Sequence, residues 1–277
     1  MKNSCIIVVL ICVLIQNINS QKTERDSTSI YKINKTIEIP VTVGLFVGSY
    51  FGFRHLSDKG GLSQAEVEAL DTKDIWRFDR WAAEQDASQR NDFHNSSDVF
   101  LNSSLALPII LGLDKEIRKD WFDILVMYTE MHGVNNAFYV AGASTFNRKR
   151  PFIYSDLVPM DERTAPETEN SFFSGHASTA AASAFFAAKV YSDYHPELGN
   201  KKYWLYGAAM VPPTLVGYYR IKAMKHFPTD IIVGTAIGAA VGILVPHFHK
   251  RKKESSFSWS PVAGSYMTGI TAKYTFK

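Results

Sequence analysis

The stretch IIVGTAIGAAVGILV, residues 231–245, runs for fifteen residues without a charge. Its glycines, Gly234, Gly238 and Gly242, recur every four residues, so they share one face of a helix and let a neighbouring helix approach closely. The alternation of apolar and polar residues that marks a half-buried strand is absent from it. The stretch therefore predicts a helix packed tightly against another helix, in a soluble bundle or in a membrane.

Five further apolar segments have the same helical character, and charged loops or loops with proline and glycine separate them. They span residues 37–53, 99–113, 121–143, 177–191 and 204–219. Together with residues 231–245 they predict an all-α fold, a bundle of about six core helices.

Two other regions have patterns of their own. Residues 59–97 are charged but carry a regular apolar face, which predicts a surface helix that caps the bundle. Residues 257–277 alternate at a period near two, which predicts a short lone strand in the C-terminal tail. We expect a signal peptide over residues 1–20, the helical domain over 21–250 and the tail over 251–277.

The N-terminus has the features of a secretory signal peptide: Lys2, an apolar core over residues 6–14 and a polar exit ending at Ser20. An uncleaved membrane anchor is the alternative. Both cysteines, Cys5 and Cys12, lie inside this segment, so the processed protein would have no disulfide and no thiolate nucleophile. We expect an exported protein of the periplasm or cell envelope.

Charge and hydropathy limit the partners. The net charge is +3, and the basic residues cluster only over residues 249–253, which argues against a nucleic-acid partner. The mean hydropathy of −0.10 is low for a six-span protein, and residues 121–143 contain Glu130 and His132. These observations slightly favour a soluble or peripheral bundle over an integral membrane protein, with membrane association as the alternative.

Three short segments carry the chemistry, and the first is Arg150-Pro151. Pro151 disfavours helical geometry for Arg150, so the guanidinium can project from the end of the preceding helix into a cavity. Taken alone, the segment is more typical of a basic helix C-terminus that complements the helix dipole.

The second segment, Ser174-Gly175-His176, begins the helix expected over residues 177–191. Ser174 is a good N-cap residue, and Gly175 lets a ligand approach the free N–H groups of the first turn. Such a turn binds anions, and His176 would face the bound group. A capped helix with an incidental surface histidine is the alternative.

The third segment contains Arg220, His226 and Asp230, and Pro228 suits the first turn of the helix that follows. The spacing predicts that the Asp230 carboxylate accepts a hydrogen bond from one nitrogen of His226 and leaves the other free to attack. Arg220 adds a fork-shaped donor for phosphate. A solvated polar loop would explain any one of these residues, but not all three segments in this order.

The three segments resemble the signature motifs of the PAP2 superfamily, which includes lipid phosphatases, acid phosphatases and vanadium haloperoxidases. The resemblance implies a helical bundle and gives each residue a role. It implies that His226 is the nucleophile, Asp230 orients it and His176 protonates the leaving oxygen. It further implies that the phosphate oxygens are held by Arg150, Ser174, Gly175 and Arg220.

The chain departs from the family pattern at three positions. Ala143 stands where the first motif usually has a lysine, Phe173 where the second has proline, and Tyr219 where the third has serine. Lys149 and Arg148 are the candidates to replace the missing positive charge. Loss of one phosphate contact costs about 1.5 to 3 kcal/mol, so we expect activity, but weak activity.

The sequence thus predicts a phosphohydrolase that cleaves a phosphomonoester or a lipid diphosphate through a phosphohistidine, with a soluble or a lipid phosphate as substrate. The expected mechanism uses no metal and no cofactor, although vanadate fits a phosphate site. The alternatives are a vanadium-dependent haloperoxidase, which such a short chain disfavours, and a non-catalytic envelope protein with a degenerate site.

Overall fold

The structure of the chain is a computed structural model that describes residues 29–251, 257–264 and 267–274, so the predicted signal peptide lies outside it. The α-helices are α2 (Lys35–Ser57), α3 (Gln64–Glu68), α4 (Arg77–Arg80), α5 (Arg90–Ala106), α6 (Lys115–Lys119), α7 (Trp121–Phe146), α8 (Met160–Arg163), α9 (Gly175–Tyr194), α10 (Lys202–Ala209), α11 (Val211–Lys222) and α12 (Pro228–His249). The 3-10 helices are η3 (Thr72–Asp74), η4 (Ala87–Gln89), η5 (Leu107–Leu113), η6 (Pro151–Tyr154) and η7 (Pro196–Lys201). Two strands follow, β1 (Phe257–Gly264) and β2 (Met267–Tyr274).

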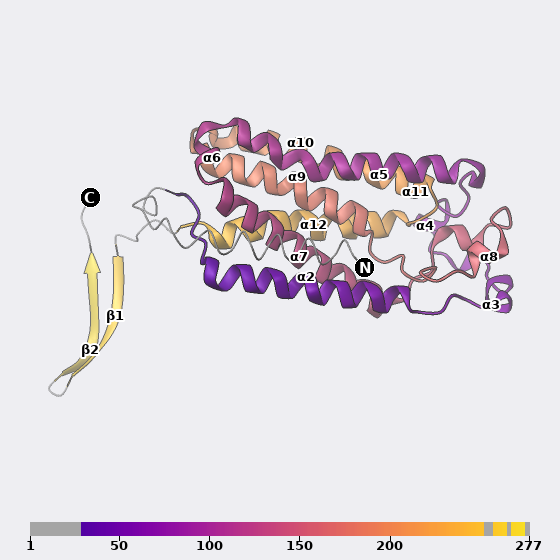
Figure 1. Cartoon of the computed structure of the whole chain (residues 1–277), viewed down its shortest axis with the longest axis horizontal. Coiled ribbons are helices and arrows are strands. Elements are labelled where there is room, and N and C mark those ends of the chain that lie inside the picture. The colour runs from indigo at the N-terminus through magenta and orange to yellow at the C-terminus, as the bar shows by residue number, and fades with distance from the viewer. Residues whose placement is uncertain (1–28, 252–256, 265–266, 275–277) are drawn as a thin grey trace, which may run out of the picture. The chain divides into compact units, whose positions relative to one another are not determined.

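Within the described residues, six long helices (α2, α5, α7, α9, α11 and α12) form the bundle, which confirms the predicted all-α fold (Figure 1). Helix α9 lies at its centre and contacts α5, α7, α10, α11 and α12. Thirteen of its twenty residues are buried, and most of them are alanine or serine. Their small side chains let several helices pack closely around α9.

The glycine row of α12 faces α9, as its spacing predicts. A Cβ atom added at Gly234 would lie 2.5 Å from the Ser174 carbonyl oxygen, and one at Gly238 would lie 2.0 Å from that of Ser178. Neither distance leaves room for a side chain, so the two helices touch through their backbones. This contact brings the N-terminal turns of α9 and α12 side by side.

The helix expected over residues 204–219 is two helices, α10 and α11, which meet at Met210. Pro212 and Pro213 follow this break in the first turn of α11. Proline lacks an N–H and its ring clashes with the carbonyl four residues before it, so one helix cannot continue through both prolines. The single-helix prediction is therefore wrong.

The regions before and after the bundle also differ from expectation. Instead of one surface helix, residues 59–89 form short helices, because capping side chains at Ser63, Asp71 and Asp86 each start a new one, and residues 90–97 begin α5. The tail is not a lone strand, since β1 and β2 pair antiparallel, with Phe257 opposite Tyr274. The alternation continues through both strands and does not reveal the reversal between them.

Large apolar side chains remain exposed on the outer helices. Ile37, Val47 and Phe51 of α2 and Ile109 and Leu113 of η5 are each more than half exposed. Within the described residues, three helices are long and apolar enough to cross a membrane: Lys35–Ser57, Ala87–Leu113 and Pro228–His249. This surface indicates membrane association, which argues against the soluble half of the predicted soluble or peripheral bundle. The charged region 59–97 lowers the mean hydropathy of the whole chain and so obscures these apolar helices.

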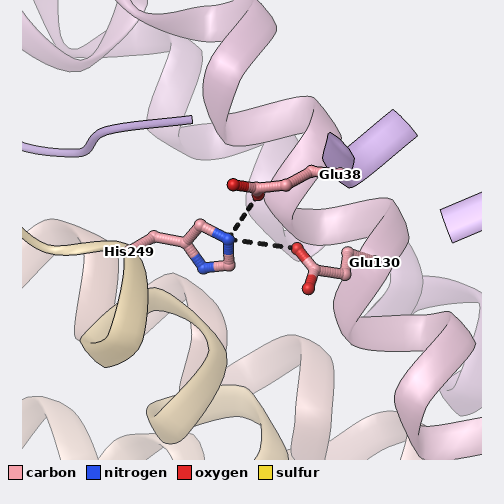
Figure 2. Close-up of side chains that lie close together, drawn as sticks. All are labelled: Glu38, Glu130 and His249. Atoms are coloured by element: carbon pink, nitrogen blue, oxygen red, sulfur yellow. Dashed lines mark hydrogen bonds and ion pairs between the residues drawn. The ribbon is translucent and has the colours of Figure 1, made fainter. Parts of the chain in front are cut away.

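An ion cluster joins three helices at the C-terminal end of α12 (Figure 2). His249 Nε2 lies 2.5 Å from Glu38 Oε2 of α2 and 3.3 Å from Glu130 Oε2 of α7. Its Nδ1 donates to the Val245 carbonyl at 2.8 Å. The imidazole is thus hydrogen-bonded to Glu38, whereas Glu130 Oε2 is within ion-pair distance but has no hydrogen-bond partner among the described residues. The same three side chains are close enough to hold a metal ion.

Candidate active site

A cavity of about 590 Å³ lies where α9 and α12 begin. Five of the seven predicted site residues line it, although they come from segments up to 76 residues apart in the sequence: Arg150, Gly175, His176, Arg220 and His226. Asp230 and Ser174 are fully buried next to it. The structure thus brings the three sequence segments together.

The imidazole of His226 is almost completely buried, in the loop before α12. Its Nδ1 donates a hydrogen bond to the Ser171 carbonyl oxygen at 2.8 Å. That bond fixes the tautomer, so Nε2 carries no hydrogen and its lone pair is available to a group bound in the cavity. Burial, followed by the charges of Arg220 and Arg150, lowers the pKa of His226 well below 6.5, so the ring is neutral at neutral pH.

The predicted hydrogen bond between His226 and Asp230 is wrong. Asp230 Oδ2 lies 3.9 Å from His226 Nδ1, and it accepts instead from the Ser171 hydroxyl at 2.7 Å and from the Phe227 N–H at 2.9 Å. Asp230 therefore contacts the two segments that flank the imidazole, and not the imidazole itself. The capping contact to Phe227 competes for the carboxylate, because residue 230 is the third residue of α12.

Arg148 has a structural role and does not replace the missing lysine. Its guanidinium donates to Asp230 Oδ1 at 2.5 Å and to Asp79 Oδ2 at 2.6 Å, and it lies over the Phe227 ring. These contacts occupy the fork and tie α4 to the start of α12. Arg148 lines a separate, smaller pocket.

The helix start at Ser174 has the local geometry that its sequence predicts. The Ser174 hydroxyl accepts from the Ala177 N–H, and the backbone N–H of Ser174 donates to the Asp230 carbonyl. These contacts bury Ser174 behind the turn, whereas Gly175 lines the cavity. A Cβ atom at Gly175 would lie 3.0 Å from the Tyr139 ring, so glycine keeps this turn open to a ligand.

Arg220 and Arg150 face the cavity from different supports. Arg220 is buried, and its Nη1 donates to His94 Nδ1 at 2.8 Å. Within the described residues its Nε is buried without a hydrogen-bond partner. Arg150 donates through Nε to the Glu167 carbonyl at 3.0 Å. Two guanidinium groups, one of which has an N–H without a partner among the described residues, make a site that favours an anion with several oxygens.

His176 lines the cavity, and its Nε2 lies 3.1 Å from Asp98 Oδ1 of α5. Burial, followed by the charge of Arg220, lowers the pKa of His176 below 6.5, and Asp98 opposes this effect. A bound phosphate would neutralise the arginine charges and favour the protonated ring. The sequence reasoning did not find Asp98, because α5 belongs to none of the three segments.

A lysine that the sequence reasoning missed, Lys225, also lines the cavity. It precedes His226, and its ammonium lies 5.0 Å from the centre of the Phe152 ring. Burial, followed by the charge of Arg150, lowers its pKa to about 8. Lys149 instead pairs with Glu169, and Ala143 is buried in α7. Lys225 is therefore a closer substitute for the missing lysine than Lys149 or Arg148.

The rest of the cavity wall is mixed. It includes apolar side chains, such as Phe53 and Leu56 of α2 and Leu101 of α5, and polar ones, such as Asn135 and Glu162. The cavity thus combines cationic side chains, which suit phosphate, with apolar side chains, which suit the carbon chain of an attached group.

Comparison with known proteins supports the same interpretation. Residues 124–254 match the model of the PAP2 superfamily, and this range contains all seven predicted site residues. The chain is 28% identical over 158 residues to a lipid A 1-phosphatase from Porphyromonas gingivalis and 29% identical over 154 residues to phosphatidylglycerophosphatase B from Bacillus subtilis. These alignments cover 55% and 54% of this chain, and they span 30% of the first relative and 71% of the second.

A similar solved structure is the crystal structure of a transmembrane PAP2-type phosphatidylglycerolphosphate phosphatase from Bacillus subtilis. The two chains are 24% identical with a TM-score of 0.44, and the alignment covers 75% of this chain and 94% of the other.

Proposed function

The chain belongs to the PAP2 superfamily, and on that premise we propose that it is a membrane-associated phosphatase that hydrolyses a lipid phosphate through a phosphohistidine at His226. One observation carries the proposal. The hydrogen bond from His226 Nδ1 to the Ser171 carbonyl leaves Nε2 for a cavity that Arg150 and Arg220 also line.

In the first step, His226 Nε2 attacks phosphorus in line with the leaving oxygen. A P–N bond forms, the ester P–O bond breaks, and His176 donates a proton to the departing alkoxide. Arg150, Arg220 and the N–H groups at the start of α9 bear the charge on the remaining phosphate oxygens. The Ser171 carbonyl stabilises the positive charge that develops on the His226 ring.

In the second step, water attacks the phosphohistidine. The neutral His176 accepts a proton from this water, the P–N bond breaks, and inorganic phosphate leaves. Both histidines then return to their starting protonation states. The rate should therefore follow a bell-shaped pH profile, because His226 must begin neutral and His176 protonated.

A lipid phosphate suits the cavity and its surroundings better than a soluble one. The apolar side chains of Phe53, Leu56 and Leu101, which line the cavity, can contact an acyl or prenyl chain. Three apolar helices would hold the protein at the bilayer that contains such a substrate. Both relatives are named as phosphatases of lipids, which supports the same class for this chain.

We place the active site on the non-cytoplasmic side of the membrane, following the signal-like N-terminus. Intact cells that produce the protein should then hydrolyse a phosphate ester that cannot cross the inner membrane. Activity that appears only after the cells are lysed would contradict this location.

Phosphate release from a phosphatidyl phosphate in detergent micelles tests the function. We expect release by the purified protein and a loss of at least about 1,000-fold in His226→Ala, since that variant lacks the nucleophile. His247→Ala is the matched control, because His247 is exposed on α12 and distant in sequence from the cavity segments. It should retain full activity.

Two other outcomes would contradict the proposal and indicate a different function. Bromide oxidation by peroxide after vanadate is added, without phosphate release, would indicate a haloperoxidase. Binding of phosphate without turnover of a monoester, diphosphate or lipid substrate would indicate a non-catalytic protein with a degenerate site.

A further inference from the structure

We propose that Asp98 of α5 is the positioning residue of the acid His176: it holds Nε2 of the ring, directs Nδ1 to the leaving oxygen and stabilises the protonated form. The inference rests on the proposed function and deepens it. Asp98 lies outside the three sequence segments and outside residues 124–254, which match the family.

The contact between the two side chains has a defined direction. His176 Nε2 lies 3.1 Å from Asp98 Oδ1, and a carboxylate at neutral pH can only accept, so Nε2 carries the hydrogen. Nδ1 is then the nitrogen available to a ligand in the cavity that His176 lines. A second proton on Nδ1 gives an imidazolium that donates at both ends, to Asp98 and to the leaving oxygen.

His94 keeps the Asp98 carboxylate free for this task. Arg220 Nη1 can only donate a hydrogen bond. His94 Nδ1 therefore accepts this bond at 2.8 Å and carries no proton. His94 Nδ1 lies 3.9 Å from Asp98 Oδ1, beyond hydrogen-bond distance, and has nothing to donate to it. One helix, α5, thus holds an arginine of the site through His94 and the acid through Asp98.

Asp98 is also the anionic group that offsets the cations around His176. Arg220 of α11 and Arg150, which precedes η6, both disfavour a proton on His176, whereas Asp98 favours one. Asp98 does not line the cavity, so it acts through the histidine and does not touch the substrate.

The experiment compares two substrates that differ only in their need for an acid. An alkyl phosphate needs a proton on its leaving oxygen, whereas a dinitrophenyl phosphate leaves without one. In Asp98→Asn we expect kcat/KM, which reports the step that releases the leaving group, to fall about 100-fold with the alkyl phosphate, the order of a general-acid contribution, and less than about 3-fold with the aryl phosphate. The basic limb of the pH profile should move to lower pH, and the acidic limb should stay.

Two further variants separate positioning from a structural role. Asp98→Glu, which keeps the charge, should restore the basic limb of the pH profile. Asp92→Asn is the matched control, because Asp92 is exposed on the same helix, and it should match the wild type with both substrates. In a His176→Ala background, Asp98→Asn should cause no further fall in kcat/KM with either phosphate, since its effect passes through His176.

The outcomes that contradict the positioning role differ from those that contradict the proposed function. Equal losses with both substrates and an unmoved pH profile, or the same loss in the His176→Ala background, would overturn the positioning role and leave Asp98 as a packing residue. If the wild type hydrolyses neither phosphate nor any lipid phosphate, the proposed function itself fails.

Discussion

The two ends of α12 present the same side chain in opposite surroundings. Just before its start, His226 Nδ1 donates to the Ser171 carbonyl at 2.8 Å, and at its end His249 Nδ1 donates to the Val245 carbonyl at 2.8 Å. Nε2 of His226 is left for a cavity lined by cationic residues, whereas Nε2 of His249 lies between Glu38 and Glu130. The neighbouring charges, and not the histidine itself, separate a candidate nucleophile from an ion-pair cluster.

Among the variants that test this contrast and keep His226, the largest effect should come from removing a cation at the His226 end. Arg220→Leu takes away a guanidinium whose buried Nε has no partner within the described residues. Loss of a charged hydrogen bond of about 1.5 to 3 kcal/mol corresponds to a fall of about 10- to 150-fold in kcat/KM. Steady-state kinetics on a lipid phosphate would measure it.

Lys222→Leu is the control for that variant, because Lys222 lies on the same helix and donates to Gln85 instead of lining the cavity. If both variants lose activity equally, the cationic surroundings of His226 have no specific role and the contrast between the two ends fails.

A second variant tests the helix that joins the two ends. Gly238→Ala puts a Cβ 2.0 Å from the Ser178 carbonyl, so α9 and α12 must separate. We expect a destabilisation of about 1 to 3 kcal/mol, partly offset by the better helix propensity of alanine. The thermal midpoint in detergent measures it. Gly44→Ala of α2, which would meet nothing within 4 Å, should not lower the midpoint.

The His249 end should affect stability and not catalysis. His249→Ala leaves two half-buried carboxylates facing each other, so we expect a loss of about 1 to 3 kcal/mol of stability. The activity of the protein that remains folded should stay within about 2-fold of the wild type. A large loss of kcat at an unchanged thermal midpoint would show that this cluster also serves the reaction.

The smallest effect concerns Lys225 and sharpens the contrast through pH. Its pKa is lowered to about 8 by burial and by the charge of Arg150, so Lys225 loses its proton as the pH rises through this value. Phosphate affinity should then fall a few-fold between pH 7 and pH 9. Titration calorimetry with inorganic phosphate measures it. In Lys225→Arg, which keeps its charge, the affinity should change less over this range.

The local elements could be predicted from the sequence because they depend on neighbours along the chain. Ser174 caps α9 through the Ala177 N–H three residues later, and the four-residue spacing of Gly234 and Gly238 already defined the face that meets another helix. The break at Met210 was predictable from Pro212 and Pro213 but was missed because the apolar pattern continues through it.

The sequence by itself determined the helical bundle, the family and the set of residues that meet at the candidate site, because periodicity, caps and motif order are properties of short segments. Only the tertiary structure decided how these residues are held. Asp98 reaches His176 across 78 positions and Arg148 reaches Asp230 across 82, and no local spacing specifies such contacts. The packing of α5 against α9 and of α7 against α12 brings these residues together, because hydrogen-bond partners are set by distance in space.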